Sequence, residues 1–296
     1  MSHVRPISLR LTVACALPAL VVCLGAAALA QPSSSAAPPA GTQPLGENAM
    51  PLIVAHRGAS GEAPENTLAA FKLAWLKQAD AIEGDFHLTR DQKIVCIHDA
   101  ATGRTAGKNL VVAQSTLADL RALDVGAWKG APWQGQQIPT LEEVLALVPP
   151  GKKLYLEIKC GPDILPPLKA ALAAAKLKPD QVIILCFDKT VLEQCRTVLP
   201  DLKAFWLVAF KNDPATGRPA IDLDKVMETL KTLGAAGLSA SAATAELAQA
   251  VRQAGKELHV WTIDDPKTVG PLVRLGCTSI TTNYPDKIRQ AAMQAK

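Results

Sequence analysis

The chain has 296 residues, of which 49% are hydrophobic and 20% are charged, and its formal net charge at pH 7 is +4. This length suits one large barrel or two ordinary domains, and it allows a sizeable hydrophobic core. So small an excess of basic residues argues against a nucleic-acid-binding protein.

The first thirty residues have the pattern of a secretory signal peptide. Two arginines precede an uncharged run over residues 11–24, and the Ala-Leu-Ala triplet at 28–30 matches the small-residue cleavage pattern. We therefore predict cleavage after Ala30 and export to the periplasm or the extracellular medium. A retained membrane anchor is disfavoured, because the uncharged run is short and contains Pro18.

Residues 31–50 are rich in proline, serine and alanine, and this composition predicts a disordered linker. No second linker interrupts residues 51–296, so we expect them to form a single domain. The cysteines after the leader are widely spaced and include no C-x-x-C pair, and we expect several of them to be small buried hydrophobic side chains. They are Cys96, Cys160, Cys186, Cys195 and Cys277.

Strand-like and helix-like patterns alternate along residues 154–282, which is typical of βα units and a parallel sheet. The strands are expected over Leu154–Ile158, Val182–Phe187, Ala204–Val208, Gly237–Ala240, Leu258–Ile263 and Ser279–Thr282. The helices between them are expected over Pro166–Ala175, Lys189–Val198, Asp222–Leu233, Thr244–Ala254 and Pro266–Leu275.

Two earlier strands, Leu52–Ala55 and Ala81–Asp85, complete a set of eight. Another strand-like run, Ile94–His98, follows the second strand too closely for a parallel crossover, which needs about a dozen residues or more. We therefore expect Ala81–Leu88 and Ile94–His98 to form an antiparallel hairpin. The predicted fold is a TIM (β/α)8 barrel with an extra β-hairpin arm after the second strand.

Carboxylates gather at the predicted ends of these strands, where the catalytic residues of TIM barrels lie. Glu83 and Asp85 alternate along one strand and therefore point to one face, and Glu157 lies near the end of the next barrel strand. Three carboxylates without thiolates suit a hard divalent cation, Ca²⁺ or Mg²⁺. Structural ion pairs with Arg57 and Lys159 are the alternative interpretation.

Two histidines and two basic side chains are expected beside the carboxylates. His56 and Arg57 follow the first strand, and Lys159 follows the strand of Glu157. The hairpin brings His98 back toward the second strand. Two histidines suit acid–base catalysis, in which one takes a proton and the other gives one. Arg57 and Lys159 suit phosphate oxygens, so the whole group indicates metal-assisted phosphodiester cleavage.

The chain resembles the glycerophosphodiester phosphodiesterase family from Leu52 to Ile288. The motifs that carry the resemblance are H-R-G-A-S-G-E-A-P-E-N-T-L-A-A-F, E-G-D-F-H-L-T-R-D, I-H-D, L-E-I-K, V-W-T-I-D and T-N-Y-P-D. The resemblance implies a barrel of the phosphatidylinositol phospholipase C type. It also implies that Glu83, Asp85 and Glu157 bind the cation, that His56 and His98 are the acid–base pair, and that Arg57 and Lys159 hold phosphate.

Two further residues are expected to support the site. Glu65, in the motif P-E-N-T, matches an acidic residue of the family, and we expect it to orient His56 or Arg57 or to act as an outer metal ligand. Trp261 is expected to form a wall of the glycerol pocket, with a buried place in the barrel as the alternative.

Other polar residues are expected to have structural roles. Asn66 is a candidate N-cap of a helix over 67–77, and Asn283 and Asp286 are expected to cap the segment after the last strand. His87 is expected on the hairpin surface; because it alternates with Glu83 and Asp85, a third polar group at the mouth of the barrel is the alternative. His259 is expected near the start of its strand, far from the catalytic end.

The leading hypothesis is a secreted, metal-dependent hydrolase that cleaves glycerophosphodiesters to glycerol 3-phosphate and an alcohol such as choline or ethanolamine. One histidine would deprotonate water or the substrate's 2-hydroxyl, and the other would protonate the leaving alcohol. A first alternative is a phospholipase acting on lysophospholipids or sphingolipids, with Trp128 and Trp133 as membrane contacts. Membrane contact is not favoured, however, and we expect these tryptophans to form a lid that packs on the barrel. A second is a non-catalytic binding barrel, against which the intact histidine and carboxylate set argues. We expect no obligatory protein partner.

Overall fold

The computed structural model describes residues 50–295. The predicted signal peptide and nearly all of the predicted linker lie outside the described residues, so these two segments stay predictions. The strands are β1 Leu52–Ala55, β2 Ala81–Leu88, β3 Ile94–Cys96, β4 Lys153–Ile158, β5 Val182–Cys186, β6 Lys203–Val208, β7 Gly237–Ala240, β8 Glu257–Val260 and β9 Ser279–Thr282. The helices are α1 Leu68–Leu76, α2 Gly103–Ala106, α3 Leu117–Arg121, α4 Leu141–Leu145, α5 Leu165–Ala174, α6 Lys189–Val198, α7 Leu223–Leu233, α8 Ala245–Gln253, α9 Val269–Arg274 and α10 Pro285–Gln294.

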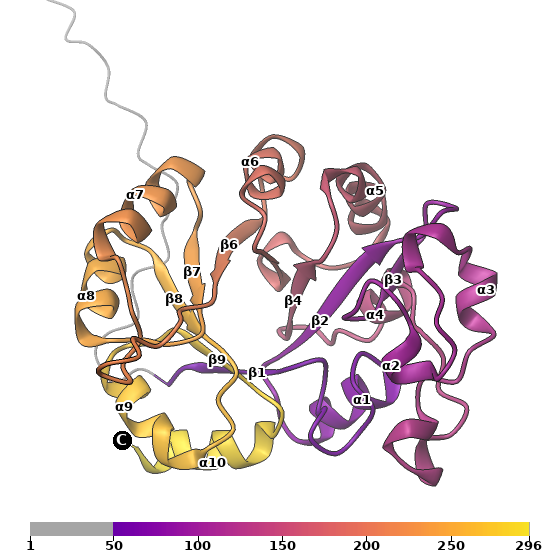
Figure 1. Ribbon diagram of the computed structural model, residues 1–296, viewed down its shortest axis with the longest axis horizontal. Coiled ribbons are helices and arrows are strands. Elements are labelled where there is room, and N and C mark those ends of the chain that lie inside the picture. Colours follow the sequence, from indigo (N-terminus) through magenta and orange to yellow (C-terminus); the bar gives the residue numbers. More distant parts are fainter. Residues whose placement is uncertain (1–49, 296) are drawn as a thin grey trace, which may run out of the picture. The chain divides into compact units, whose positions relative to one another are not determined.

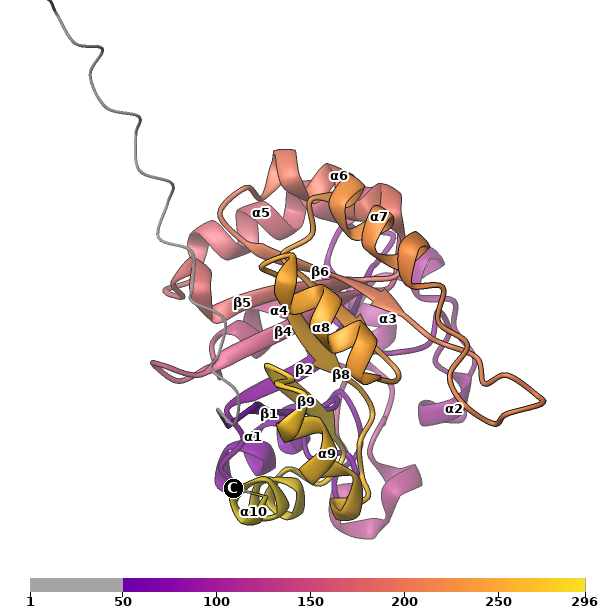
Figure 2. The same cartoon turned by 90° about the vertical axis from the view of Figure 1, so that its left-hand side faces the viewer.

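Eight of the strands form a closed parallel barrel. From β1 the neighbours run β9, β8, β7, β6, β5, β4 and β2, and the pairing of β2 with β1 closes the ring. Helices lie around the outside of the strands (Figures 1 and 2). The predicted TIM barrel is therefore confirmed.

The ninth strand is the expected hairpin arm. β3 runs antiparallel to β2, with Phe86 opposite Cys96. It is shorter than predicted, because pairing with β2 ends at the hydrogen bond from Ile97 N to Asp85 O (2.9 Å). His98 thus follows the last paired residue of the hairpin and lies at the level of Asp85.

The barrel interior holds a small apolar cluster, whereas a larger one fills the space between strands and helices. The inner cluster includes Val54, Tyr155, Phe205 and Leu207. Side chains alternate between the two faces of a strand, so β1, β2, β4, β5 and β6 contribute to both clusters. Burial of these side chains is the main stabilising contribution to the barrel.

Helix starts follow the capping chemistry of the sequence, with one correction. Thr140 and Glu143 form a capping box at the start of α4. Thr67, not Asn66, caps α1, because its side chain accepts a hydrogen bond from Ala70 N (3.1 Å). Asn66 is thereby free for the site described below.

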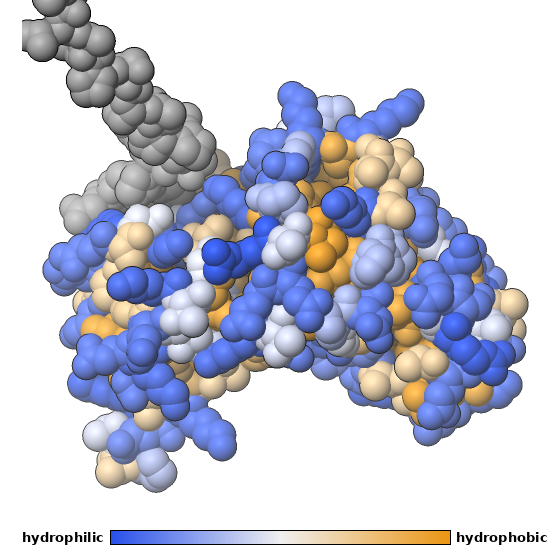
Figure 3. Space-filling view, turned by 90° about the horizontal axis from the view of Figure 1, so that it is seen from above, coloured by the Kyte–Doolittle hydropathy of each residue, from blue (hydrophilic) through white to orange (hydrophobic). Residues whose placement is uncertain are grey.

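The cysteine prediction is confirmed. All five cysteines in the described part of the chain are free, and all except Cys160 are buried. Among residues 50–295, no helix has the length and apolar character needed to cross a membrane. On the face shown in Figure 3, hydrophilic residues surround a hydrophobic area near the centre.

Candidate active site

A pocket of about 210 Å³ opens at the carboxyl ends of the barrel strands. Sequence alternation places polar side chains of β2 and β4 on its walls, and the chain that leaves β1 adds two more. Its polar lining is His56, Arg57, Glu83, His98, Glu157, Lys159, His259, Thr262 and Thr281. Its apolar lining is Leu185, Phe187, Leu207 and Trp261. The structure thus brings together the residues that the sequence predicted, from elements far apart in the chain.

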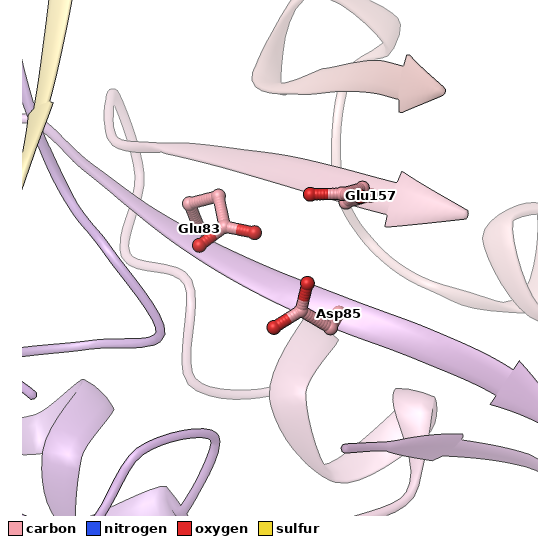
Figure 4. A group of neighbouring side chains, drawn as sticks. All are labelled: Glu83, Asp85 and Glu157. Carbon is pink, nitrogen blue, oxygen red and sulfur yellow. The ribbon is translucent and has the colours of Figure 1, made fainter. Parts of the chain in front are cut away.

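Three carboxylates meet beside this pocket. One oxygen each of Glu83, Asp85 and Glu157 lies within 4.8 Å of the others, and Figure 4 shows the groups gathered over β2 and β4. Asp85 and Glu157 are register partners on these two parallel strands. Glu83 Oε1 and Asp85 Oδ1 are buried and have no hydrogen-bond partner among residues 50–295. Buried, unsatisfied carboxylate oxygens at this spacing fit a hard divalent cation.

The carboxylates titrate unequally. Burial, with the negative charges of Asp85 and Glu157, raises the pKa of Glu83 well above its usual value. Burial and Asp85 likewise raise the pKa of Glu157 to about 7. Burial would raise the pKa of Asp85 as well, but Arg57 and Lys159 hold it below the usual value. The cluster therefore has a shortage of positive charge that a cation would relieve.

Two basic side chains partly compensate this charge. Arg57 Nε lies 3.2 Å from Asp85 Oδ2, and Lys159 Nζ lies 3.3 Å from Asp85 Oδ1 and 2.6 Å from Glu157 Oε1. These are the ion pairs named as the alternative interpretation. They leave Glu83 without a side-chain partner, so ion pairing alone does not account for all three carboxylates.

His56 is held by an amide. Its Nδ1 lies 2.8 Å from Asn283 Oδ1, and Asn283 Nδ2 donates to Asp264 Oδ2 (2.6 Å). The carboxylate fixes the amide orientation, so Asn283 Oδ1 accepts and His56 Nδ1 carries the proton. His56 Nε2 is then a free acceptor. Burial and the nearby Arg57 lower the pKa of His56, which keeps this imidazole neutral at pH 7.

His98 is held by a carboxylate instead. Its Nδ1 lies 2.6 Å from Asp99 Oδ1, so Nδ1 carries a proton here too. Hydrogen bonds from Arg104 and His98 lower the pKa of Asp99 to about 2, and Asp99 stays ionised. Both imidazoles therefore present Nε2 rather than Nδ1 for chemistry.

Arg104 connects Asp99, the partner of His98, with Glu65, the partner of Arg57. Its Nε donates to Asp99 Oδ2 (2.6 Å), and its two terminal nitrogens donate to Glu65 (2.8 Å each). Glu65 Oε1 also accepts from Arg57 Nη1 (2.9 Å). Of the roles expected for Glu65, orientation of Arg57 is the one that these contacts support. Arg104 was not predicted from the sequence, because it lies in a segment without hydrophobic periodicity.

Two structural expectations were wrong. Asn66 Nδ2 donates to Asp85 Oδ2 (2.8 Å), and Asn66 Oδ1 accepts from Asp85 N, which fixes this carboxylate. His87 is buried, and its Nε2 lies 3.1 Å from the carbonyl oxygen of His98. The turn after the hairpin arm covers His87, a contact that a strand pattern cannot show.

Three residues near the chain's end also differ in part from expectation. Asn283 does not cap a helix but contacts His56, because β9 ends beside β1. Asp286 lies in the first turn of α10 and pairs with Lys77 (2.7 Å). His259 lines the pocket instead of lying far from it. Trp261 lines the pocket as expected, with its ring perpendicular to Phe187 at 5.9 Å.

Comparison with known proteins agrees with this geometry. The glycerophosphoryl diester phosphodiesterase family matches residues 56–287. The glycerophosphodiester phosphodiesterase of Bacillus subtilis (strain 168) is 35% identical over 253 residues, which cover 79% of this chain and 84% of that protein. The glycerophosphodiester phosphodiesterase of Caldanaerobacter subterraneus is 30% identical over 80% of this chain and 96% of its own length.

A solved structure supports the same assignment. It is an Oleispira antarctica phosphodiesterase in complex with the product sn-glycerol-3-phosphate, with a TM-score of 0.73 and 28% identity over 82% of this chain and 96% of that chain. The chain therefore belongs to the glycerophosphoryl diester phosphodiesterase family and is a phosphoric diester hydrolase.

Proposed function

We propose that this protein hydrolyses glycerophosphodiesters to glycerol 3-phosphate and an alcohol, with His56 and His98 as the acid–base pair. The observation that carries the proposal is that two imidazoles line one small pocket, each with Nδ1 occupied by a fixed partner. Each Nε2 is thereby available to exchange a proton with a bound diester. A pocket of about 210 Å³ suits a small polar diester better than a lipid.

The unequal surroundings of the imidazoles assign their roles. His56 is half-buried, neutral and bonded to a neutral amide, so it is the base that takes a proton from water or from the substrate's 2-hydroxyl. His98 is bonded to the ionised Asp99, which compensates the positive charge of an imidazolium. His98 is therefore the acid that protonates the leaving alcohol.

Glu83, Asp85 and Glu157 would hold a divalent cation, Ca²⁺ or Mg²⁺, which supplies positive charge for the phosphate oxygens when bound. Arg57 and Lys159 line the same pocket and bind phosphate oxygens from the side of Asp85. Glu65 keeps the Arg57 guanidinium in place for this contact.

The substrate and the leader point to an exported enzyme. Signal-peptide cleavage after Ala30 would release the barrel into the periplasm or the medium, where small diesters from lipid breakdown are its substrates. The proposal needs neither nucleic acid nor a protein partner.

The test is release of glycerol 3-phosphate from glycerophosphocholine by the protein without residues 1–30. Activity is measured with EDTA and with added Ca²⁺ or Mg²⁺, for the wild type, His56→Ala and Glu83→Gln. Glu193→Gln, an exposed change on α6, is the matched control. We expect metal-dependent release that both site variants lose and the control keeps. Release that persists in His56→Ala would contradict the assigned base.

A further inference from the structure

A line of hydrogen bonds crosses the barrel interior and ends at the pocket. Tyr155 Oη lies 3.2 Å from Ser279 Oγ, which in turn lies 2.7 Å from His259 Nδ1. On the far side of this imidazole, Nε2 lies 2.9 Å from Thr281 Oγ1. All four side chains are at most 2% exposed, and His259 and Thr281 line the pocket.

The strand register places these residues together. Ser279 and Thr281 alternate on β9 and so point to the same interior face, and His259 on β8 is the register partner of Ser279. The Tyr155 ring stacks at a tilt on His259, with centroids 5.1 Å apart. The imidazole is therefore fixed by packing as well as by two hydrogen bonds.

His259 carries a single proton. Burial, with the nearby His56, lowers its pKa to about 3, so the ring is neutral at the pH of any ordinary assay. A neutral imidazole donates from one nitrogen and accepts at the other. The four side chains then hold four hydrogens for three hydrogen bonds, and one hydrogen is left over.

Only three proton arrangements satisfy all three hydrogen bonds. Two of them protonate His259 Nδ1 and leave over a hydrogen of either Tyr155 or Ser279, each of which is buried with no other side-chain partner in the described part of the chain. The third protonates His259 Nε2 and leaves over the hydroxyl hydrogen of Thr281, which, unlike Tyr155 and Ser279, lines the pocket and meets whatever occupies it. An unsatisfied buried donor is costly, so the third arrangement is favoured.

We propose that the Thr281 hydroxyl donates a hydrogen bond to the terminal hydroxyl of the glycerol moiety and so selects glycerol diesters. The inference rests on the proposed function and adds a specificity residue to it. His259, Ser279 and Tyr155 are positioning residues, because they act by fixing Thr281 Oγ1 as the acceptor of the imidazole N–H and leaving its own hydrogen for the ligand.

Thr281 lies below the carboxyl ends of the strands, and this position favours contact with the terminal hydroxyl of the glycerol moiety. Thr281 pairs with Val54, whose side chain belongs to the inner apolar cluster, two residues before His56. A phosphate held by Arg57 and Lys159 at the strand ends leaves only a small group to reach this depth. The 2-hydroxyl is adjacent to the phosphate, whereas the terminal hydroxyl is one carbon farther away and extends to Thr281.

The kinetic test compares glycerophosphocholine with its analogue built on propane-1,2-diol, which keeps the 2-hydroxyl and lacks the terminal one. We expect the wild type to prefer glycerophosphocholine in kcat/KM by about 3- to 10-fold, mainly through KM. Thr281→Val, which keeps the shape of the side chain, should abolish this preference. Thr281→Ser, which keeps the hydroxyl, should retain the ratio between the two substrates.

An unchanged preference in Thr281→Val would overturn the assignment. Loss of turnover on both substrates by the same factor would do so as well, because it would indicate a packing role. Absence of turnover by the wild type would refute the proposed function itself. Side-chain ¹⁵N shifts of His259 in the wild type provide a test without activity: we expect the Nε2–H tautomer, and the Nδ1–H tautomer would refute the donor direction.

Discussion

The carboxylate cluster predicts that affinity for the divalent cation rises with pH. A bound cation needs Glu83, Asp85 and Glu157 in their ionised forms, but the metal-free protein holds a proton on Glu157 until its pKa of about 7. Glu83 also has a raised pKa and contributes in the same direction. Binding must therefore expel protons at neutral pH.

The size of the effect follows from Glu157. With a pKa of about 7, roughly one tenth of its carboxyls are ionised at pH 6 and roughly nine tenths at pH 8. The apparent affinity for Ca²⁺ or Mg²⁺ should rise about tenfold over this range from Glu157 alone. Any proton that Glu83 still holds makes the rise steeper.

The assay is calorimetric titration of the metal-free protein at pH 6, 7 and 8, in two buffers of different ionisation enthalpy. The difference in heat between the buffers counts the protons released. Glu157→Gln should bind more weakly and with a flatter pH dependence, whereas Glu193→Gln should match the wild type. An affinity that does not change between pH 6 and 8, without proton release, would refute the reasoning about the cluster.

Three further predictions concern residues outside the predicted ligand set. Arg104→Met should lower kcat by about tenfold in steady-state assays, because Asp99 and Glu65 lose their common hydrogen-bond donor. Arg218→Met, an exposed change, is the control, and equal activity in the two variants would exclude this role of Arg104. Asn283→Ala should lower kcat/KM about 10- to 100-fold with normal thermal unfolding, and a loss caused by misfolding would show in the unfolding curve. Phe71→Ala, at a fully buried position, should lower the free energy of urea unfolding by about 3–5 kcal/mol, and a change under 1 kcal/mol would contradict the assigned core.

The barrel was predictable because its signals are local. Each strand is a short apolar run, and each connection is either long enough for a crossover or, after Leu88, too short for one. The carboxylates were predictable for the same reason, since Glu83 and Asp85 alternate on one strand and Glu157 follows on the next. α10 was not predicted, although it packs beside β1 and completes the helical layer.

The groups that hold the proposed catalytic side chains were not predictable in this way. Asn283 meets His56 across 227 positions of sequence, and Arg104 meets Glu65 across 39. Such contacts arise only when the barrel closes and the loops fold over it. A single polar residue in a loop belongs to no periodic pattern, so its sequence context predicts only a capping or surface role.

His259 shows the same limit inside the barrel. The strand was expected over Leu258–Ile263, which placed His259 near its start. The observed β8 spans Glu257–Val260, so His259 is the next-to-last residue of its strand. His259 and Thr281 therefore line the pocket together, each as the third residue of a four-residue strand.

The two histidines proposed as the acid–base pair illustrate how partners outside the pocket influence the chemistry proposed within it. An amide and a carboxylate both fix an imidazole by accepting from Nδ1, so either would serve for orientation alone. They differ in charge: Asn283 adds none, and burial then keeps His56 neutral, whereas Asp99 places a full negative charge beside His98. Arg104 keeps Asp99 ionised while tying it to Glu65 and, through Glu65, to Arg57. The contacts that hold Arg57, the proposed phosphate ligand, are thus physically continuous with those that hold His98, the proposed acid.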